Sequence, residues 1–203
     1  WNRAWFSATH GDGQEAIAWG HRSIELSPDP LNNAFSLGWT GYAYLEHGDA
    51  EHAIGLLGQS IELLAGMRYL RLVGWFKGWL AEAFLLAGDH VRARGEAQLG
   101  LQISADVGFT WAVGLAQRVL GAIARAGGDQ GEAEHWLNEA LRTFGTVQSR
   151  FDAARTHLAL AELAHEQQQP ASAAAHRQAA GRLLTELGLP AGIARGQQLA
   201  AGN

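Results

Sequence analysis

Small residues recur at a fixed interval along the chain, and this recurrence constrains the fold more than any other feature. Gly-Asp pairs begin at Gly11, Gly48, Gly88 and Gly128, at spacings of 37, 40 and 40 residues. An alanine stands five residues after each of these glycines, and an alanine or glycine stands seven residues before it. One further step of 40 extends both series. The first series is Ala16, Ala53, Ala93, Ala133 and Ala173, and the second is Ala4, Gly41, Ala81, Gly121 and Ala161. Such a chain is expected to stack copies of one unit.

Each unit reads as a pair of antiparallel helices. Apolar residues follow helical spacing, and two helices that cross closely need a residue without bulk on each facing surface. Asp12 with Glu15, and Asp129 with Glu132, have the spacing of capping boxes at helix starts. No stretch alternates with period two for long, which argues against strands. We expect helices at about 1–10, 13–26, 31–47, 50–65, 69–87, 90–104, 110–126, 130–144, 150–166, 170–187 and 191–201.

The predicted architecture is all-α: one right-handed superhelical solenoid of antiparallel helix pairs. It has about five units, at about 1–30, 31–67, 68–108, 109–148 and 149–188, and a C-terminal capping helix within 189–203. Gly66, Gly108, Gly145 and Gly188 stand where the second helices should end, and we expect them to act as C-terminal caps.

Composition excludes several classes of function. The 203-residue chain has a net charge of −5, which argues against a nonspecific nucleic-acid binder. It has no cysteine, and therefore no disulfide or thiolate metal site. No apolar run approaches the roughly 18 residues of a membrane helix, and no leader opens the chain, so we expect a cytoplasmic protein. Because the first residue is Trp1, we expect a piece of a longer protein.

Two segments resemble tetratricopeptide repeats. They are GDGQEAIAWGHRSIELSPDP at 11–30 and GYAYLEHGDAEHAIGLLGQSIELL at 41–64. The 40-residue step is similar to the long variant in C-terminal sensor regions of bacterial signalling ATPases, LuxR-type regulators and cyclase-linked regulators. The resemblance implies a TPR-like α-solenoid that binds protein in bacterial signal transduction. One position departs from the family, because its large apolar residue is Leu37 in the second unit but Lys77, Gln117 and His157 in later ones.

We find no catalytic, cofactor or metal site in the sequence. His165-Glu166 begins like the zinc-protease motif HExxH, with His157 and Glu162 nearby, but the second histidine of that motif is replaced by Gln169. Phosphate-binding and nucleophile-elbow motifs are absent as well. We therefore predict no enzymatic activity and no cofactor.

The first helices of successive units should line the concave surface. Their exposed faces would present aromatic residues in the first half and charged residues in the second, with Gly38 and Gly78 leaving floor space between the rings. We predict a binding groove formed by Phe35, Trp39, Tyr42, Trp75, Trp79, Glu82, Arg118, Arg125 and Arg155. Rings and arginines are the side chains most common at binding hot spots.

Two questions stay open at this stage. The tryptophans fit interhelix packing as readily as a groove wall, and Arg118 and Arg125 could be paired with Glu82 or Glu162. Three functions are considered: a scaffold that binds protein or peptide in its concave groove, a small-ligand sensor domain, and a self-association module that uses its N-terminal face. The first is the leading prediction.

Overall fold

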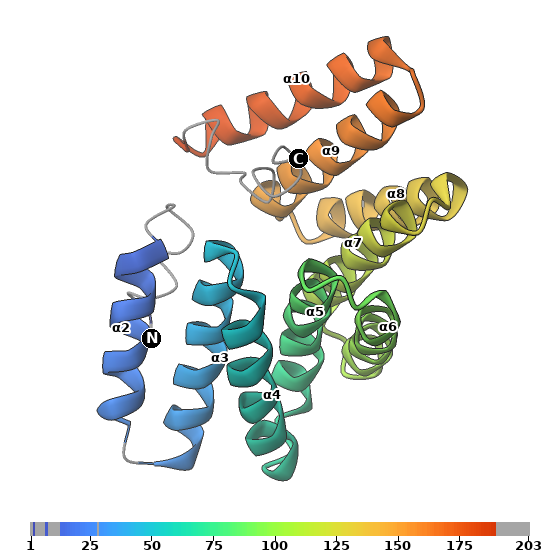
Figure 1. Ribbon diagram of the computed structural model, residues 1–203. Coiled ribbons are helices and arrows are strands. Elements are labelled where there is room, and N and C mark those ends of the chain that lie inside the picture. Colours follow the sequence, from blue (N-terminus) through green and yellow to red (C-terminus); the bar gives the residue numbers. More distant parts are fainter. Residues whose placement is uncertain (1, 3–6, 8–12, 28, 190–203) are drawn as a thin grey trace.

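The computed structural model describes residues 2, 7, 13–27 and 29–189 (Figure 1). All regular structure in this part of the chain is helical, which confirms the all-α prediction. The helices are α2 (Gly13–Glu25), α3 (Pro30–His47), α4 (Ala50–Gly66), α5 (Leu70–Leu86), α6 (His90–Asp106), α7 (Thr110–Ala126), α8 (Gln130–Thr146), α9 (Arg150–Glu166) and α10 (Pro170–Glu186). The helix expected at 191–201 lies outside the described residues, as do Ala4, Asp12 and most of the helix expected at 1–10.

The helices are uniform in length and spacing. Each of α4 to α10 has 17 residues, and three residues separate each from the next. From α3 onward, one residue after the end of each helix has positive φ: Gly48, Arg68, Gly88, Gly108, Gly128, Gln148, Gln168 and Gly188. At Gly88, for example, the amide donates to the Leu85 carbonyl and the next amide, of Asp89, donates to that of Phe84. This is the Schellman pattern, which satisfies carbonyls at a helix end.

Two of the four predicted glycine caps are wrong. Gly108 and Gly188 occupy left-handed positions, with φ of 67° and 68°. Gly66 and Gly145, by contrast, lie within the last turns of α4 and α8. Arg68 and Gln148 adopt the left-handed conformation instead, on exposed turns that tolerate a polar residue there.

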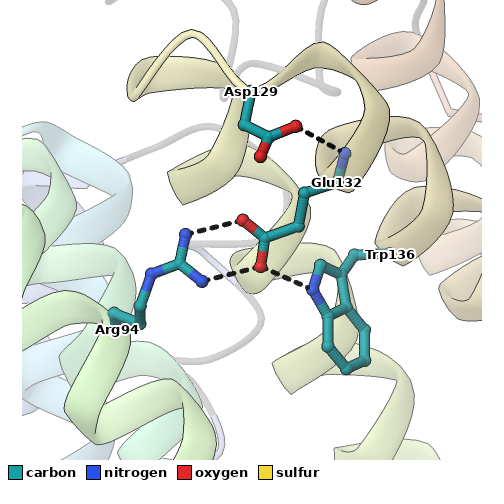
Figure 2. A network of polar contacts seen from close by, with 4 residues as sticks. All are labelled: Arg94, Asp129, Glu132 and Trp136. Atoms are coloured by element: carbon teal, nitrogen blue, oxygen red, sulfur yellow. Dashed lines mark hydrogen bonds and ion pairs between the residues drawn. The ribbon is translucent and has the colours of Figure 1, made fainter.

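Aspartates cap the helices that follow the Gly-Asp turns. Asp49, Asp89 and Asp129 each accept a hydrogen bond from the backbone amide three residues on. The capping box predicted at Asp129 forms only in part, because the Glu132 side chain does not accept a hydrogen bond from the Asp129 backbone amide. Its carboxylate binds both Nη atoms of Arg94, at 2.7 and 2.9 Å, and accepts from Trp136 Nε1 at 3.2 Å (Figure 2). The hydrogen bonds from Arg94 lower the pKa of Glu132.

The small-residue series marks the closest approach of the two helices in each pair. Ala53, Ala93 and Ala133 are completely buried, and Ala173 is 1% exposed. A Cβ on Gly41 would lie 2.8 Å from Leu57 Cγ, and one on Gly121 would lie 2.7 Å from Leu137 Cγ. Because no bulkier residue fits without movement, these positions set the spacing of the paired helices, as predicted.

The helices form two rows. Among the described residues, the first helices of successive pairs contact one another: α3 with α5, α5 with α7, and α7 with α9. No such contact joins α4 to α6, α6 to α8 or α8 to α10. The first helices therefore follow the inside of the curve, and we call α3, α5, α7 and α9 the inner row and α4, α6, α8 and α10 the outer row. None of the described helices is long and apolar enough to cross a membrane.

Candidate functional site

Aromatic rings from three inner helices gather in one cluster. Tyr42 of α3 stacks on Trp79 of α5, with ring centroids 4.3 Å apart and planes at 25°. Trp39 lies edge-on to Trp75 and Trp79, at 5.3 and 5.1 Å. We define the inner aromatic cluster as Trp39, Tyr42, Trp75, Phe76, Trp79, Phe109 and Trp111. The predicted groove residues Trp39, Tyr42, Trp75 and Trp79 are thus brought together, and Phe35 lies half-buried one turn before Trp39.

The cluster is enclosed. Trp39, Tyr42 and Trp79 are each 5% exposed or less, and Trp75 is half-buried. The expectation that Gly38 and Gly78 leave open floor between the rings is wrong. A Cβ on Gly38 would fall 2.2 Å from the Phe76 ring, and one on Gly78 would fall 2.9 Å from Leu115. Side chains of the next unit fill both spaces, so the glycines admit neighbouring side chains into the stack.

The predicted charged residues all form ion pairs along the inner row. Arg118 Nη2 of α7 lies 2.7 Å from Glu82 Oε1 of α5, and Arg125 pairs with Glu162 of α9. The partners considered from the sequence, Glu82 and Glu162, are therefore the observed ones. Arg118 is nevertheless buried, at 8% exposure, and does not form a solvated stripe.

Arg155 forms a contact of another kind. Its Nη1 lies 3.3 Å from Glu46 Oε1, and the two residues belong to α9 and α3, which are separated by two intervening helix pairs. The side chains are only 11% and 17% exposed. In a solenoid each unit normally contacts only its neighbours. This pair, which we call the cross-row pair, therefore joins two distant parts of the curve.

Glu46, Glu82, Arg118, Asp152 and Arg155 form what we call the inner charge cluster. Burial would lower the pKa of Arg155, but the carboxylates of Glu46 and Glu82 reverse this effect and raise it above its ordinary value. Burial also raises the pKa of the Tyr42 phenol, and the charge of Glu46 adds to the rise. Arg155 is thus held as a cation and Tyr42 as a neutral phenol.

Sequence reasoning missed five members of these clusters: Phe76, Phe109, Trp111, Glu46 and Asp152. Trp111 lies 4.8 Å from Trp75 and donates from Nε1 to Asp152 at 2.7 Å. Asp152, 7% exposed, also accepts from Ser149 at 2.6 Å. A buried carboxylate at a helix start has no distinguishing sequence signal, and Glu46 resembles any polar residue of a last helical turn.

The histidines and carboxylates of α9 pair with different partners. His157 Nδ1 lies 3.0 Å from His176 Nδ1 of α10, whereas Glu162 and Glu166 both lie near Arg125. Among the residues that the structure describes, no group of three or more histidines, aspartates or glutamates could hold a metal ion.

Known proteins resemble this chain in structure and not in sequence. No family model and no curated protein matches the sequence. A Rap protein in complex with competence and sporulation factor superposes with a TM-score of 0.82 at 14% identity, covering 91% of this chain and 52% of the other. This chain thus spans about half the length of that protein.

Two further structures show the same arrangement. A signal-transduction ATPase with a tetratricopeptide repeat sensor, from Pyrococcus horikoshii, gives a TM-score of 0.66 at 17% identity, covering 97% of this chain and 30% of the other. A set of nearly identical TPR-like repeats from Podosopora anserina gives 0.60 at 17% identity, covering 91% and 92%. With its helix pairs, small-residue series and inner row, the chain has the fold of a tetratricopeptide-type repeat protein.

Proposed function

We propose that the inner row binds an extended segment of a protein partner and that this module carries no catalysis of its own. The observation that supports this function is the presence of three arginine–carboxylate pairs, two of them largely buried, beside an aromatic cluster on the inside of the curve. A solenoid core needs only apolar contacts between neighbouring units.

The energetics of the pairs argue for a role beyond folding. A buried ion pair adds little stability compared with well-packed apolar residues of the same volume, because two charges must leave water. Arg118 and Arg155 of the inner row, whose ion pairs are largely buried, are therefore poorly explained as stabilising elements. Aromatic rings and arginines are, however, the side chains that contribute most at binding hot spots.

The structural neighbours favour a regulatory setting. The Rap structure contains competence and sporulation factor, and the Pyrococcus ATPase carries its tetratricopeptide repeats as a sensor. By analogy, we place this module in a larger bacterial regulatory protein, where its partner is a protein or peptide. It would act in the cytoplasm.

A small-ligand sensor is the second candidate, and the convergence of aromatic rings from neighbouring helices favours it. Rings such as Tyr42 and Trp79, which stack on each other, are of the kind that lines small-molecule sites. A metabolite screen by thermal shift tests this alternative, since a compound that binds only the folded state raises the melting temperature. Self-association, the third candidate, concerns the N-terminal face, most of which lies outside the described residues.

A displayed library of unstructured 12-residue peptides tests the leading proposal. Peptides selected on the wild-type chain should bind it in solution and should lose binding to the charge-swapped variant Glu82→Arg/Arg118→Glu. This swap retains the ion pair, so the fold is expected to survive. The matched control is the swap Arg94→Glu/Glu132→Arg in the outer row, which should bind as the wild type does. Failure to select any peptide would overturn the proposal.

A further inference from the structure

The Glu82–Arg118 pair has polar atoms left without a partner. Arg118 Nη2 contacts Glu82 Oε1, but Arg118 Nε and Glu82 Oε2 are buried and make no hydrogen bond to any described residue. Trp75 Nε1, two helical turns before Glu82 on the same face of α5, is in the same state. Buried polar groups are nearly always satisfied, because a buried donor or acceptor without a partner destabilises the fold. Among the described residues, Arg118 Nε, Arg118 Nη2 and Trp75 Nε1 are therefore buried donors, and Glu82 Oε2 is a buried acceptor, that lack a hydrogen bond.

The charges around these atoms restrict which chemical group could form hydrogen bonds with them. The inner charge cluster contains three carboxylates, Glu46, Glu82 and Asp152, and two arginines. An incoming anion would therefore meet a net negative site. A cation is equally unsuitable, because it has no acceptor to offer to Arg118 Nε or Trp75 Nε1. A neutral group that carries both an acceptor and a donor meets both requirements.

We propose that Glu82 and Arg118 form a subsite for an amide group of the bound segment. The amide oxygen accepts from Arg118 Nε, and an amide N–H donates to Glu82 Oε2. These two protein atoms belong to planar groups already in contact, so one edge of an amide-bearing residue can reach both. An Asn or Gln carboxamide presents its oxygen and an N–H on one edge. A residue in extended backbone likewise presents its C=O and N–H toward one side.

This subsite rests on the proposed function, because an amide partner arrives as part of a peptide segment. The subsite also differs from one in which arginine alone binds a carboxylate. The acceptor Glu82 Oε2 would repel a carboxylate, whereas it pairs with an amide.

Side-chain N–H resonances of a ¹⁵N-labelled chain give a direct test. The Arg118 Nε–H and Trp75 Nε1–H signals would be assigned from the variants Arg118→Lys and Trp75→Phe. Titration with acetamide should shift the Arg118 Nε–H signal, while acetate and methylammonium at equal concentration should not. N-acetylglycine N-methylamide, which presents the C=O and N–H of one residue on the same side, separates the sources: a response to both amides supports backbone recognition, and a response to acetamide alone supports an Asn or Gln side chain. An equal response to acetate, or none to either amide, would overturn the subsite.

Peptides selected on the wild type separate this inference from the proposed function. Arg118→Lys keeps the charge and removes the Nε–H, so these peptides should bind about tenfold more weakly, the factor that about 1.4 kcal/mol represents. Arg94→Lys, in the outer row and also paired with a carboxylate, is the matched control and should bind as before. If Arg118→Lys is unstable, Glu82→Leu replaces it, since it removes the acceptor. Equal binding by all variants refutes the subsite and leaves the proposed function intact, whereas a wild type that selects no peptide refutes both.

Discussion

At the scale of single residues, polar pairs replace an apolar contact inside the later helix pairs. The position occupied by Leu37 in the second unit holds Lys77, Gln117 and His157 in the next three. Each finds a partner on the second helix of its own pair: Lys77 binds Glu96, Gln117 accepts from Thr143 at 2.7 Å, and His157 contacts His176. The sequence revealed the departure from the repeat pattern. It could not reveal the partners, because they lie 19 to 26 residues away on the facing helix and share no residue type.

The histidine pair should make the stability of the last helix pair depend on pH. Burial lowers the folded-state pKa of His157, as do His176 and Arg182 nearby, and burial lowers that of His176 although Glu134 opposes the shift. The unfolded chain therefore binds protons more readily below the ordinary histidine pKa of about 6.5. Consequently the free energy of unfolding should fall as the pH drops below about 6.5 and should level off above it. Urea unfolding between pH 5 and 8 measures this.

The double variant His157→Gln/His176→Gln isolates the contribution of the pair. The difference in unfolding free energy between wild type and variant should shrink as the pH falls through this range. Parallel pH profiles for the two proteins would show that the pair does not titrate as described.

At the scale of helices and turns, the sequence was sufficient for most of the fold. The small-residue series and the helical spacing of apolar residues predicted α2 to α10 with ends within two residues of those observed. The errors fall at turns between units. Glycine there marks the left-handed residue only at 108 and 188, while Arg68 and Gln148 adopt the same conformation without a glycine signal. Because the Schellman hydrogen bonds involve only backbone atoms, side-chain identity is an incomplete guide to them.

Two glycine-to-alanine substitutions distinguish a real cap from a misassigned one. Gly108→Ala places a side chain at φ 67° and should destabilise the chain by about 1–2 kcal/mol. Gly145→Ala lies in the last turn of α8, where no atom stands within 4 Å of the new Cβ, and should stabilise it by up to about 1 kcal/mol. Thermal and urea unfolding of both variants measures the two effects. A loss of stability in Gly145→Ala as large as that in Gly108→Ala would contradict the turn assignment.

At the scale of the whole molecule, the candidate site was only partly predictable. The gathering of the aromatic residues follows from repeat positions, because equivalent positions of adjacent units lie side by side, whereas the partners of Arg118 and Arg125 lie about one helical turn from the equivalent positions. The cross-row pair does not, because Glu46 and Arg155 meet only through curvature accumulated over the intervening units. A small rotation at each interface decides whether they touch, and no local pattern encodes that sum. The same argument explains why a sequence read as an open groove folds with its aromatic cluster enclosed.

The cross-row pair should limit how far the stack can open. It is the only ion pair among the described residues that joins nonadjacent helix pairs. Glu46→Gln leaves Arg155 buried without its nearest carboxylate and should cost about 1–3 kcal/mol. Replacing both partners, as Glu46→Leu/Arg155→Met, should leave stability nearly unchanged while removing the restraint. Small-angle scattering should then report a larger radius of gyration for the double variant.

The outer row supplies the matched control for that experiment. Arg94 and Glu132 form a bidentate pair between adjacent units, so Arg94→Met/Glu132→Leu removes an ion pair of similar chemistry without touching the contact across the curve. Its radius of gyration should equal that of the wild type. Equal radii for all three proteins would mean that curvature is set by interfaces between neighbouring units alone, and that a partner segment could enter the inner row without separating Glu46 from Arg155. If only the Glu46→Leu/Arg155→Met variant expands, a partner segment that enters the inner row would have to separate Glu46 from Arg155. Binding would then be coupled to the shape of the solenoid through this ion pair.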